Sequence, residues 1–178
     1  MDIKLISPGS NAPEEVNVVI EIPMNSGPIK YEYDLENDTI AVDRFMPTSM
    51  SYPCNYGFVP NTLSGDGDPA DVLVYSRYPI VPGALIKARP IGVLMTEDES
   101  GMDAKILAVP AKKTDPFFAH IEEYTDLPEL VIGSIEHFFE NYKKLEKGKW
   151  VKVSGWESAK KAKQQINESI AKFEKKSA

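Results

Sequence analysis

Short runs of β-branched and aromatic residues near the N-terminus limit the possible folds more than any other part of the sequence. They read VNVVIEI at residues 16–22, IKYEYD at 29–34 and IAVDRF at 40–45, and turn-forming residues separate them. Such runs predict β-strands, and connections this short favour antiparallel neighbours. We therefore expect these three strands to form a meander.

Strand character returns later in the chain, after a stretch that has little of it. Residues 47–69 contain four prolines, counting Pro47 and Pro69 themselves, and three glycines. We therefore expect that stretch to be irregular, which in a compact domain usually serves a function. One later strand candidate has a break near Pro90. The later candidates are 71–75, 85–96, 104–109 and 150–156.

The last third of the chain changes to a helical period. Apolar residues there recur at steps of three and four, which is typical of one face of an amphipathic helix. The first such set is Val131, Ile135, Phe138, Tyr142 and Leu145, and the second is Ala159, Ala162, Ile166, Ile170 and Phe173. Pro128 suits the start of the first helix and Gly148 its end. Many short strands followed by two helices predict an α+β domain with a small, mostly antiparallel barrel or sheet.

Composition limits the classes of function that the chain can have. Its 178 residues suffice for one domain, which we expect to span residues 1–178. A net charge of −7 argues against general nucleic-acid binding. The chain contains neither a membrane-spanning apolar segment nor a secretory signal, so we expect a cytoplasmic protein. One cysteine, Cys54, and two histidines make a disulfide or a zinc site improbable, which leaves oxygen ligands for any metal.

Three carboxylates are crowded into the turn Asp66–Asp71, which reads DGDPAD. Like charges this close disfavour one another's ionisation unless a cation neutralises them, so the turn predicts a site for a hard divalent metal. A calcium-binding EF-hand is excluded, because position five is Ala70 and position twelve is Arg77. A second acidic loop, residues 97–103, could supply carboxylates to more than one metal.

Charged residues also alternate along one of the predicted strands. Lys30, Glu32 and Asp34 fall on one face of strand 29–34, with Tyr31 and Tyr33 on the other. A solvent-facing surface of a sheet would look the same, so this face alone does not define a site.

The segment DGDPADV at residues 66–72 resembles the signature of the family I inorganic pyrophosphatases. The resemblance extends through almost the whole chain, and it implies a five-stranded OB-type antiparallel β-barrel with flanking helices, two of them C-terminal. The short chain is similar to the bacterial form, which implies a homo-oligomer, usually a hexamer. The other similar segments are 21–23, 30–32, 43–44, 52–60, 98–105 and 142–143.

The resemblance also implies a reaction and a role for each site residue. The reaction is Mg²⁺-dependent hydrolysis of pyrophosphate to two orthophosphates, with several Mg²⁺ ions per site. The residue similar to the family's general base is Asp68. The implied metal ligands are Asp66, Asp71, Asp103, Asp98, Glu21 and Glu32. The implied phosphate-binding residues are Lys30, Arg44, Tyr56, Lys105, Tyr142 and Lys143.

Some of these residues have other readings. Tyr142 falls on the apolar stripe of its helix and could be a core residue, and Lys143 could be a solvated helix residue. Glu99 could be a plain loop charge, Asp43 a surface residue and Tyr52 a packing partner of the site.

Two other functions are compatible with parts of the sequence. A two-metal phosphodiesterase or nuclease would use similar carboxylates but would need a basic groove, against the acidic balance of the chain. A binding module for single strands or for a calcium-dependent partner would want aromatic residues on a basic sheet face. The predicted face instead mixes Lys30 with Glu32 and Asp34.

Overall fold

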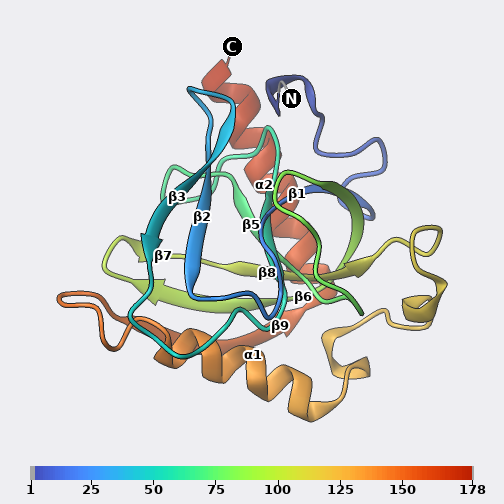
Figure 1. Ribbon diagram of the computed structural model, residues 1–178. Coiled ribbons are helices and arrows are strands. Elements are labelled where there is room, and N and C mark those ends of the chain that lie inside the picture. The colour runs from blue at the N-terminus through green and yellow to red at the C-terminus, as the bar shows by residue number, and fades with distance from the viewer. Residues whose placement is uncertain (1–2, 178) are drawn as a thin grey trace.

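The computed structural model describes residues 3–177, and Figure 1 shows a strand-rich body flanked by two helices. The strands are β1 (Val16–Ile22), β2 (Ile29–Asp34), β3 (Thr39–Phe45), β4 (Asn55–Val59), β5 (Ala70–Val74), β6 (Leu85–Asp98), β7 (Gly101–Met102), β8 (Lys105–Pro110) and β9 (Val151–Ser158). The α-helices are α1 (Glu129–Asn141) and α2 (Ala159–Ser177). Short 3₁₀ turns lie at Ile3–Leu5, Pro116–Phe118 and Tyr124–Asp126.

Five strands pair in a closed ring. The order is β1, β4, β5, β8 and β6, and β6 pairs back with β1. This ring confirms the five-stranded barrel-like fold expected from the resemblance, but it is mixed rather than wholly antiparallel, because β5 and β8 run parallel. β7 and β9 add to β6 outside the ring. The break expected near Pro90 is a shift in the pairing of β6 with β8 between Pro90 and Gly92.

The predicted meander of the first three strands is wrong. β2 and β3 form a separate two-stranded hairpin, while β1 pairs with β4 and β6. The reason lies in burial: six of the seven residues of β1 are buried, so it belongs inside the ring, whereas β2 and β3 alternate with charged residues and stay partly exposed. Local turn signals predicted the hairpin but not the partner of β1.

A further strand, β4, lies in the stretch that the prolines led us to expect as irregular. All five of its residues are buried, and prolines 53 and 60 flank it without entering its pairing. Gly57 allows β4 to cross closely over β1, because a Cβ atom at that position would lie 1.9 Å from the carbonyl oxygen of Val19. This contact brings Tyr56 and Glu21 to the same part of the ring.

The ring buries both of its faces. In β5, Val72 and Val74 belong to an apolar cluster that includes Ala162 and Ile166 of α2. Leu73, between them, belongs to a second cluster that includes residues of α1. Helices therefore cover both faces, and this explains why β5 and β8 are almost continuous apolar runs.

The two helices lie where the periodicity predicted them, with one difference in length. α1 ends at Asn141 rather than at Gly148, and Leu145 is 74% exposed although it continues the apolar period. Only α2 is C-terminal in the strict sense, because β9 follows α1. Tyr142 caps the end of α1, where its backbone N–H still donates to the carbonyl oxygen of Phe138, and Lys143 follows in a turn.

Candidate active site

Every site residue predicted from the sequence lines one cavity of about 360 Å³. The residues come from most strands of the ring, from the hairpin and from the end of α1. They are Glu21, Lys30, Glu32, Arg44, Tyr56, Asp66, Asp68, Asp71, Asp98, Asp103, Lys105, Tyr142 and Lys143. Lys30 and Glu32 of the charged face of β2 line the cavity, although the Glu32 side chain is 56% exposed to solvent. Asp34 lies outside the cavity and accepts hydrogen bonds from Asn37.

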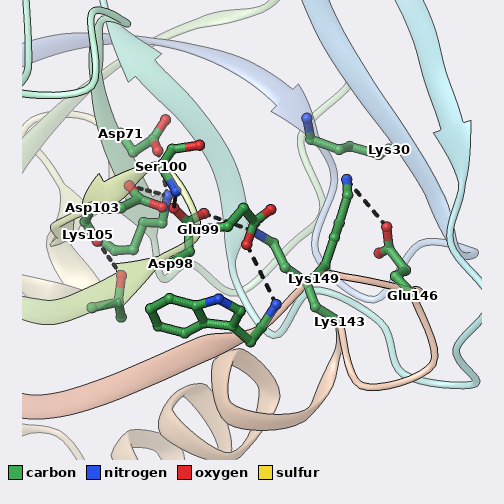
Figure 2. Close-up of polar contacts among 12 residues, drawn as sticks. Lys30, Asp71, Asp98, Glu99, Ser100, Asp103, Lys105, Lys143, Glu146 and Lys149 are labelled. Atoms are coloured by element: carbon green, nitrogen blue, oxygen red, sulfur yellow. Dashed lines mark hydrogen bonds and ion pairs between the residues drawn. The ribbon is translucent and has the colours of Figure 1, made fainter.

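Lys105 lies among the carboxylates of the cavity (Figure 2). The parallel pairing of β5 with β8 sets Val72 beside Ile106, so Asp71 lies beside Lys105. The Nζ atom of Lys105 is 2.5 Å from Oδ2 of Asp71 and 2.7 Å from Oδ1 of Asp103. It also donates to the Tyr56 hydroxyl at 3.2 Å. The buried Lys105 ammonium thus links Asp71 of the first acidic loop to Asp103 of the second.

Lys143 also contacts the second acidic loop, through carboxylates other than the one that Lys105 contacts. Its Nζ atom lies 2.8 Å from Oδ2 of Asp98 and 3.8 Å from Oε1 of Glu99 (Figure 2). The solvated alternative for Lys143 is wrong, because the residue is buried. Tyr142 is a core residue, since its ring stacks on Phe138, and it also lines the cavity.

The hairpin presents Lys30 and Arg44 side by side, because the two residues are paired across β2 and β3. Asp43 bridges them, at 3.1 Å from Lys30 and 2.6 Å from Arg44. It is an exposed residue outside the cavity lining, as its surface reading expected, and it holds two residues of the lining together. Glu146 accepts two hydrogen bonds from the Arg44 guanidinium, at 2.9 and 3.1 Å, and pairs with Lys149 at 3.3 Å.

Glu146 and Lys149 were missed from the sequence. Glu146 is separated from Arg44 by 102 positions. Glu146 lies off the apolar stripe of the predicted helix and Lys149 lies beyond its predicted end, and neither is in a segment that carries the resemblance. Both lie in the connection after α1, in residues 142–150, which the helical period wrongly assigned in part to the helix. Figure 2 shows the Lys149 side chain reaching toward Glu146 from this connection.

The acidic turn at residues 66–71 is open on its outer side. Asp66, Gly67 and Asp68 are exposed, and Gly67 has a φ of +98°, which favours glycine. The backbone N–H of Asp68 donates to Oδ1 of Asp66 at 3.1 Å. Among residues 3–177, neither Asp66 nor Asp68 forms an ion pair. Their side chains are thus available to a ligand from the cavity.

Comparison with known proteins shows which family this chain resembles. A model of the inorganic pyrophosphatase family matches residues 18–174. The chain is 63% identical over 162 residues to an inorganic pyrophosphatase of Rickettsia bellii, a match that covers 91% of this chain and 93% of that one. The crystal structure of an inorganic pyrophosphatase from Thermus thermophilus superposes with a TM-score of 0.93 at 45% identity, covering 98% of this chain and 99% of that one.

The chain belongs to the inorganic pyrophosphatase family. It is accordingly an enzyme of the hydrolase class. A structure titled as an inorganic phosphatase, from Anaplasma phagocytophilum, is similar as well, with a TM-score of 0.94 at 57% identity, covering 95% of this chain and 99% of that one.

Acidic side chains predominate in the cavity, although the namesake substrate of the family is an anion. Eight acidic side chains and five basic ones line it. Burial, with smaller contributions from Asp71 and Glu32, raises the pKa of Glu21 to about 8. Burial and neighbouring carboxylates also raise the pKa of Asp68 and that of Asp103. The acidic side chains of the cavity thus outnumber the basic ones, and burial makes several of them harder to ionise.

These carboxylates fit the chemistry of Mg²⁺. Within residues 3–177, no group of three or more metal-binding side chains lies close enough together to hold a metal ion. Burial alone would lower the pKa of Lys105, but Asp71 and Asp103 raise it above its usual value, so Lys105 stays charged beside these two carboxylates. Mg²⁺ does not need such a group of side chains, because it is normally held by one or two carboxylates together with water and substrate phosphate. The donors are all hard oxygens. Their pKa values are raised first by burial and in smaller part by neighbouring carboxylates, whose charge a cation would offset.

Proposed function

We propose that the chain hydrolyses inorganic pyrophosphate to two orthophosphates and that it requires Mg²⁺. The observation that carries this proposal is the cavity, in which two acidic loops meet five basic side chains at one place. Family membership supports pyrophosphate as the substrate. The excess of acidic side chains supports a cation requirement, because an anionic substrate would otherwise be repelled.

The proposed metal ligands are the carboxylates on three sides of the cavity. Asp66 and Asp71 come from the first acidic loop, Asp98 and Asp103 from the second, and Glu21 and Glu32 from β1 and β2. Bound there, Mg²⁺ would neutralise substrate charge and lower the pKa of water. Glu21 is already fixed in place, since it accepts a hydrogen bond of 2.7 Å from the backbone N–H of Tyr33.

Asp68 is the proposed general base. Its raised pKa makes it a better proton acceptor than an ordinary aspartate. It has no ammonium or guanidinium partner among the described residues, so its carboxylate oxygens are free to accept the proton of a water molecule. Asp66 and Asp71 flank it, which lets one turn supply both ligands and base.

The basic residues and two tyrosines of the cavity are proposed to bind the phosphate groups. Lys30 and Arg44 meet the substrate from the hairpin, and Lys105 and Lys143 from the opposite strands and the end of α1. Arg offers a fork to phosphate oxygens and Lys a point charge. Burial raises the pKa of Tyr56 and of Tyr142 far above neutrality, so both hydroxyls remain neutral donors.

The activity can be tested by phosphate release from pyrophosphate. The purified protein is assayed with Mg²⁺, with EDTA, and with bis(p-nitrophenyl) phosphate in place of pyrophosphate. We expect turnover of pyrophosphate only with Mg²⁺ and little cleavage of the diester. A preference for the diester would instead favour the phosphodiesterase alternative, and no turnover of either compound would refute the proposal.

We further propose that the enzyme acts in the cytoplasm as a homo-oligomer, specifically a hexamer. Exposed apolar side chains such as Phe45 and Leu130 are candidates for subunit contacts. No helix in residues 3–177 is long and apolar enough to cross a membrane. Light scattering should give a mass of about six times the 19.8 kDa of the chain; a monomer would contradict the proposed assembly.

A further inference from the structure

A buried threonine closes the base of the loop that carries the first acidic turn. Thr62 is only 2% exposed and lies between β4 and that turn. Its hydroxyl donates to the carbonyl oxygen of Val59 at 2.6 Å and accepts from the backbone N–H of Ala70 at 2.9 Å. The side chain therefore ties the end of β4 to the first residue of β5, where the loop returns to the ring.

The rest of the loop, residues 63–69, is held by few contacts. The backbone N–H of Ser64 donates to the carbonyl oxygen of Asp68 at 2.7 Å, and that of Leu63 donates to the carbonyl oxygen of Ser169 in α2 at 2.9 Å. Asp66 and Asp68 themselves are exposed. Ala70 lies between Asp68 and Asp71 in the chain, so the position of its backbone N–H affects both carboxylates.

We propose that Thr62 is a positioning residue for the reaction, and that its hydroxyl fixes the geometry of the first acidic turn. The inference rests on the proposed roles of Asp66, Asp68 and Asp71. A hydroxyl can donate and accept at once, and here it satisfies two buried backbone groups. Without it these groups must move or draw in water, and a base displaced by about 1 Å can lose about a hundredfold in rate.

Three substitutions at this position separate the hydroxyl from the shape of the side chain. Thr62→Val keeps the shape and removes both hydrogen bonds, Thr62→Ser keeps both, and Thr62→Cys replaces the hydroxyl by a weaker donor and acceptor. At saturating Mg²⁺ we expect Thr62→Val to lower kcat by about tenfold or more, with KM changed less than about twofold. The kcat of Thr62→Ser should stay within about twofold of wild type, and that of Thr62→Cys should lie between the other two.

A matched control lies just past the other end of β5. Ser76 is also buried, and its hydroxyl donates to the carbonyl oxygen of Tyr78 at 2.7 Å and accepts from Asn55 at 2.9 Å. Ser76→Ala therefore removes a similar double hydrogen bond away from the cavity. We expect it to lower the Tm while leaving kcat within about twofold of wild type.

Magnesium binding gives a second measurement that does not depend on turnover. Calorimetric titration without substrate should show the Kd for Mg²⁺ rising about threefold or more in Thr62→Val and staying near wild type in Thr62→Ser and Ser76→Ala. Wild-type kcat and Kd in Thr62→Val would overturn the inference. So would a Ser variant as impaired as Val, or a Ser76→Ala variant that loses as much kcat.

Two further results remain interpretable. If circular dichroism shows that Thr62→Val does not fold, the Ser and Cys variants decide, and a Cys variant with wild-type kcat and Kd overturns the inference. If the wild-type protein does not hydrolyse pyrophosphate, the proposed function fails, while the Mg²⁺ titrations still test whether the Thr62 hydroxyl positions the turn.

Discussion

The two acidic loops of the cavity differ in how their charges are compensated. In the second loop, residues 97–103, Asp98 pairs with Lys143 and Asp103 with Lys105. In the first, residues 66–71, only the last carboxylate has such a partner, which is again Lys105. The remaining two aspartates have no ion pair among residues 3–177.

The pKa values of Asp98 and Asp68 reflect this difference. The pKa of Asp103 does not, because burial raises it despite the contact with Lys105. Partial burial would raise the pKa of Asp98, but Lys143 lowers it below its usual value. Burial and its neighbours Asp66 and Asp71 raise the pKa of Asp68. The first loop is therefore suited to take up a proton or a cation directly. In the second loop, Asp98 and Asp103 are each already paired with a lysine.

The largest effect should come from removing the proposed base from the first loop. Asp68→Asn keeps the size of the side chain but cannot accept the proton, so we expect kcat to fall by about a thousandfold, roughly 4 kcal/mol. The Kd for Mg²⁺ should change less than about threefold, because Asp66 and Asp71 remain. Turnover and calorimetric titration of the same preparation measure both. Near-normal turnover would assign the base to another residue.

The next largest effect should come from the lysine that the two loops share. Lys105→Met leaves Asp71 and Asp103 without their buried partner, which should cost roughly 3 kcal/mol in the free energy of unfolding without metal. Mg²⁺ should recover part of that loss, because a cation can replace the ammonium. Urea unfolding at neutral pH with EDTA and with Mg²⁺ measures this.

Lys112→Met is the control for that experiment. Lys112 pairs with Glu122 at 2.7 Å, but both side chains are more than half exposed. Its loss should cost less than about 1 kcal/mol and should not respond to Mg²⁺. If Lys105→Met is as stable as this control, the charge balance inferred for the two loops is wrong.

Much of this site could be predicted because its residues lie in local patterns. The crowding of Asp66 and Asp68 in a turn is visible in the sequence, as is the alternation of Lys30 and Glu32 along a strand. The existence of both helices followed from periodicity. The resemblance then linked segments that local patterns cannot link, and the cavity brings all of its predicted residues together.

What could not be predicted depends on contacts between distant parts of the chain. The partner strands of β1 are set by its burial on both faces, which turn signals between neighbouring strands do not reveal. Glu146 reaches Arg44 only because α1 ends early, at Asn141. The hydroxyl of Thr62 gives no signal in the sequence, since its two partners are backbone groups.

A third carboxylate, Glu21, extends the comparison through its response to pH. Its pKa of about 8 lies above the usual 4.5, so between these values the folded protein holds a proton that the unfolded chain has lost. In EDTA, stability should therefore fall as pH rises through this window, by up to about 1.4 kcal/mol per unit. Glu21→Gln cannot ionise, so its stability relative to wild type should rise by about 2 kcal/mol between about pH 5.5 and about pH 7. Urea unfolding at both pH values measures this, and parallel changes in the two proteins would contradict the raised pKa.

The smallest effect should come from a carboxylate of the second loop that is only loosely held. Glu99 lies 3.8 Å from Lys143, and its side chain is 33% exposed. Solvent screens such a contact, so Glu99→Gln should change kcat/KM by less than about threefold. Asp98→Asn removes the closer pair at 2.8 Å and a proposed metal ligand, and should lower kcat/KM by about tenfold or more. Equal losses in the two variants would mean that the net charge of the second loop, rather than the contact of Asp98 with Lys143, determines its contribution.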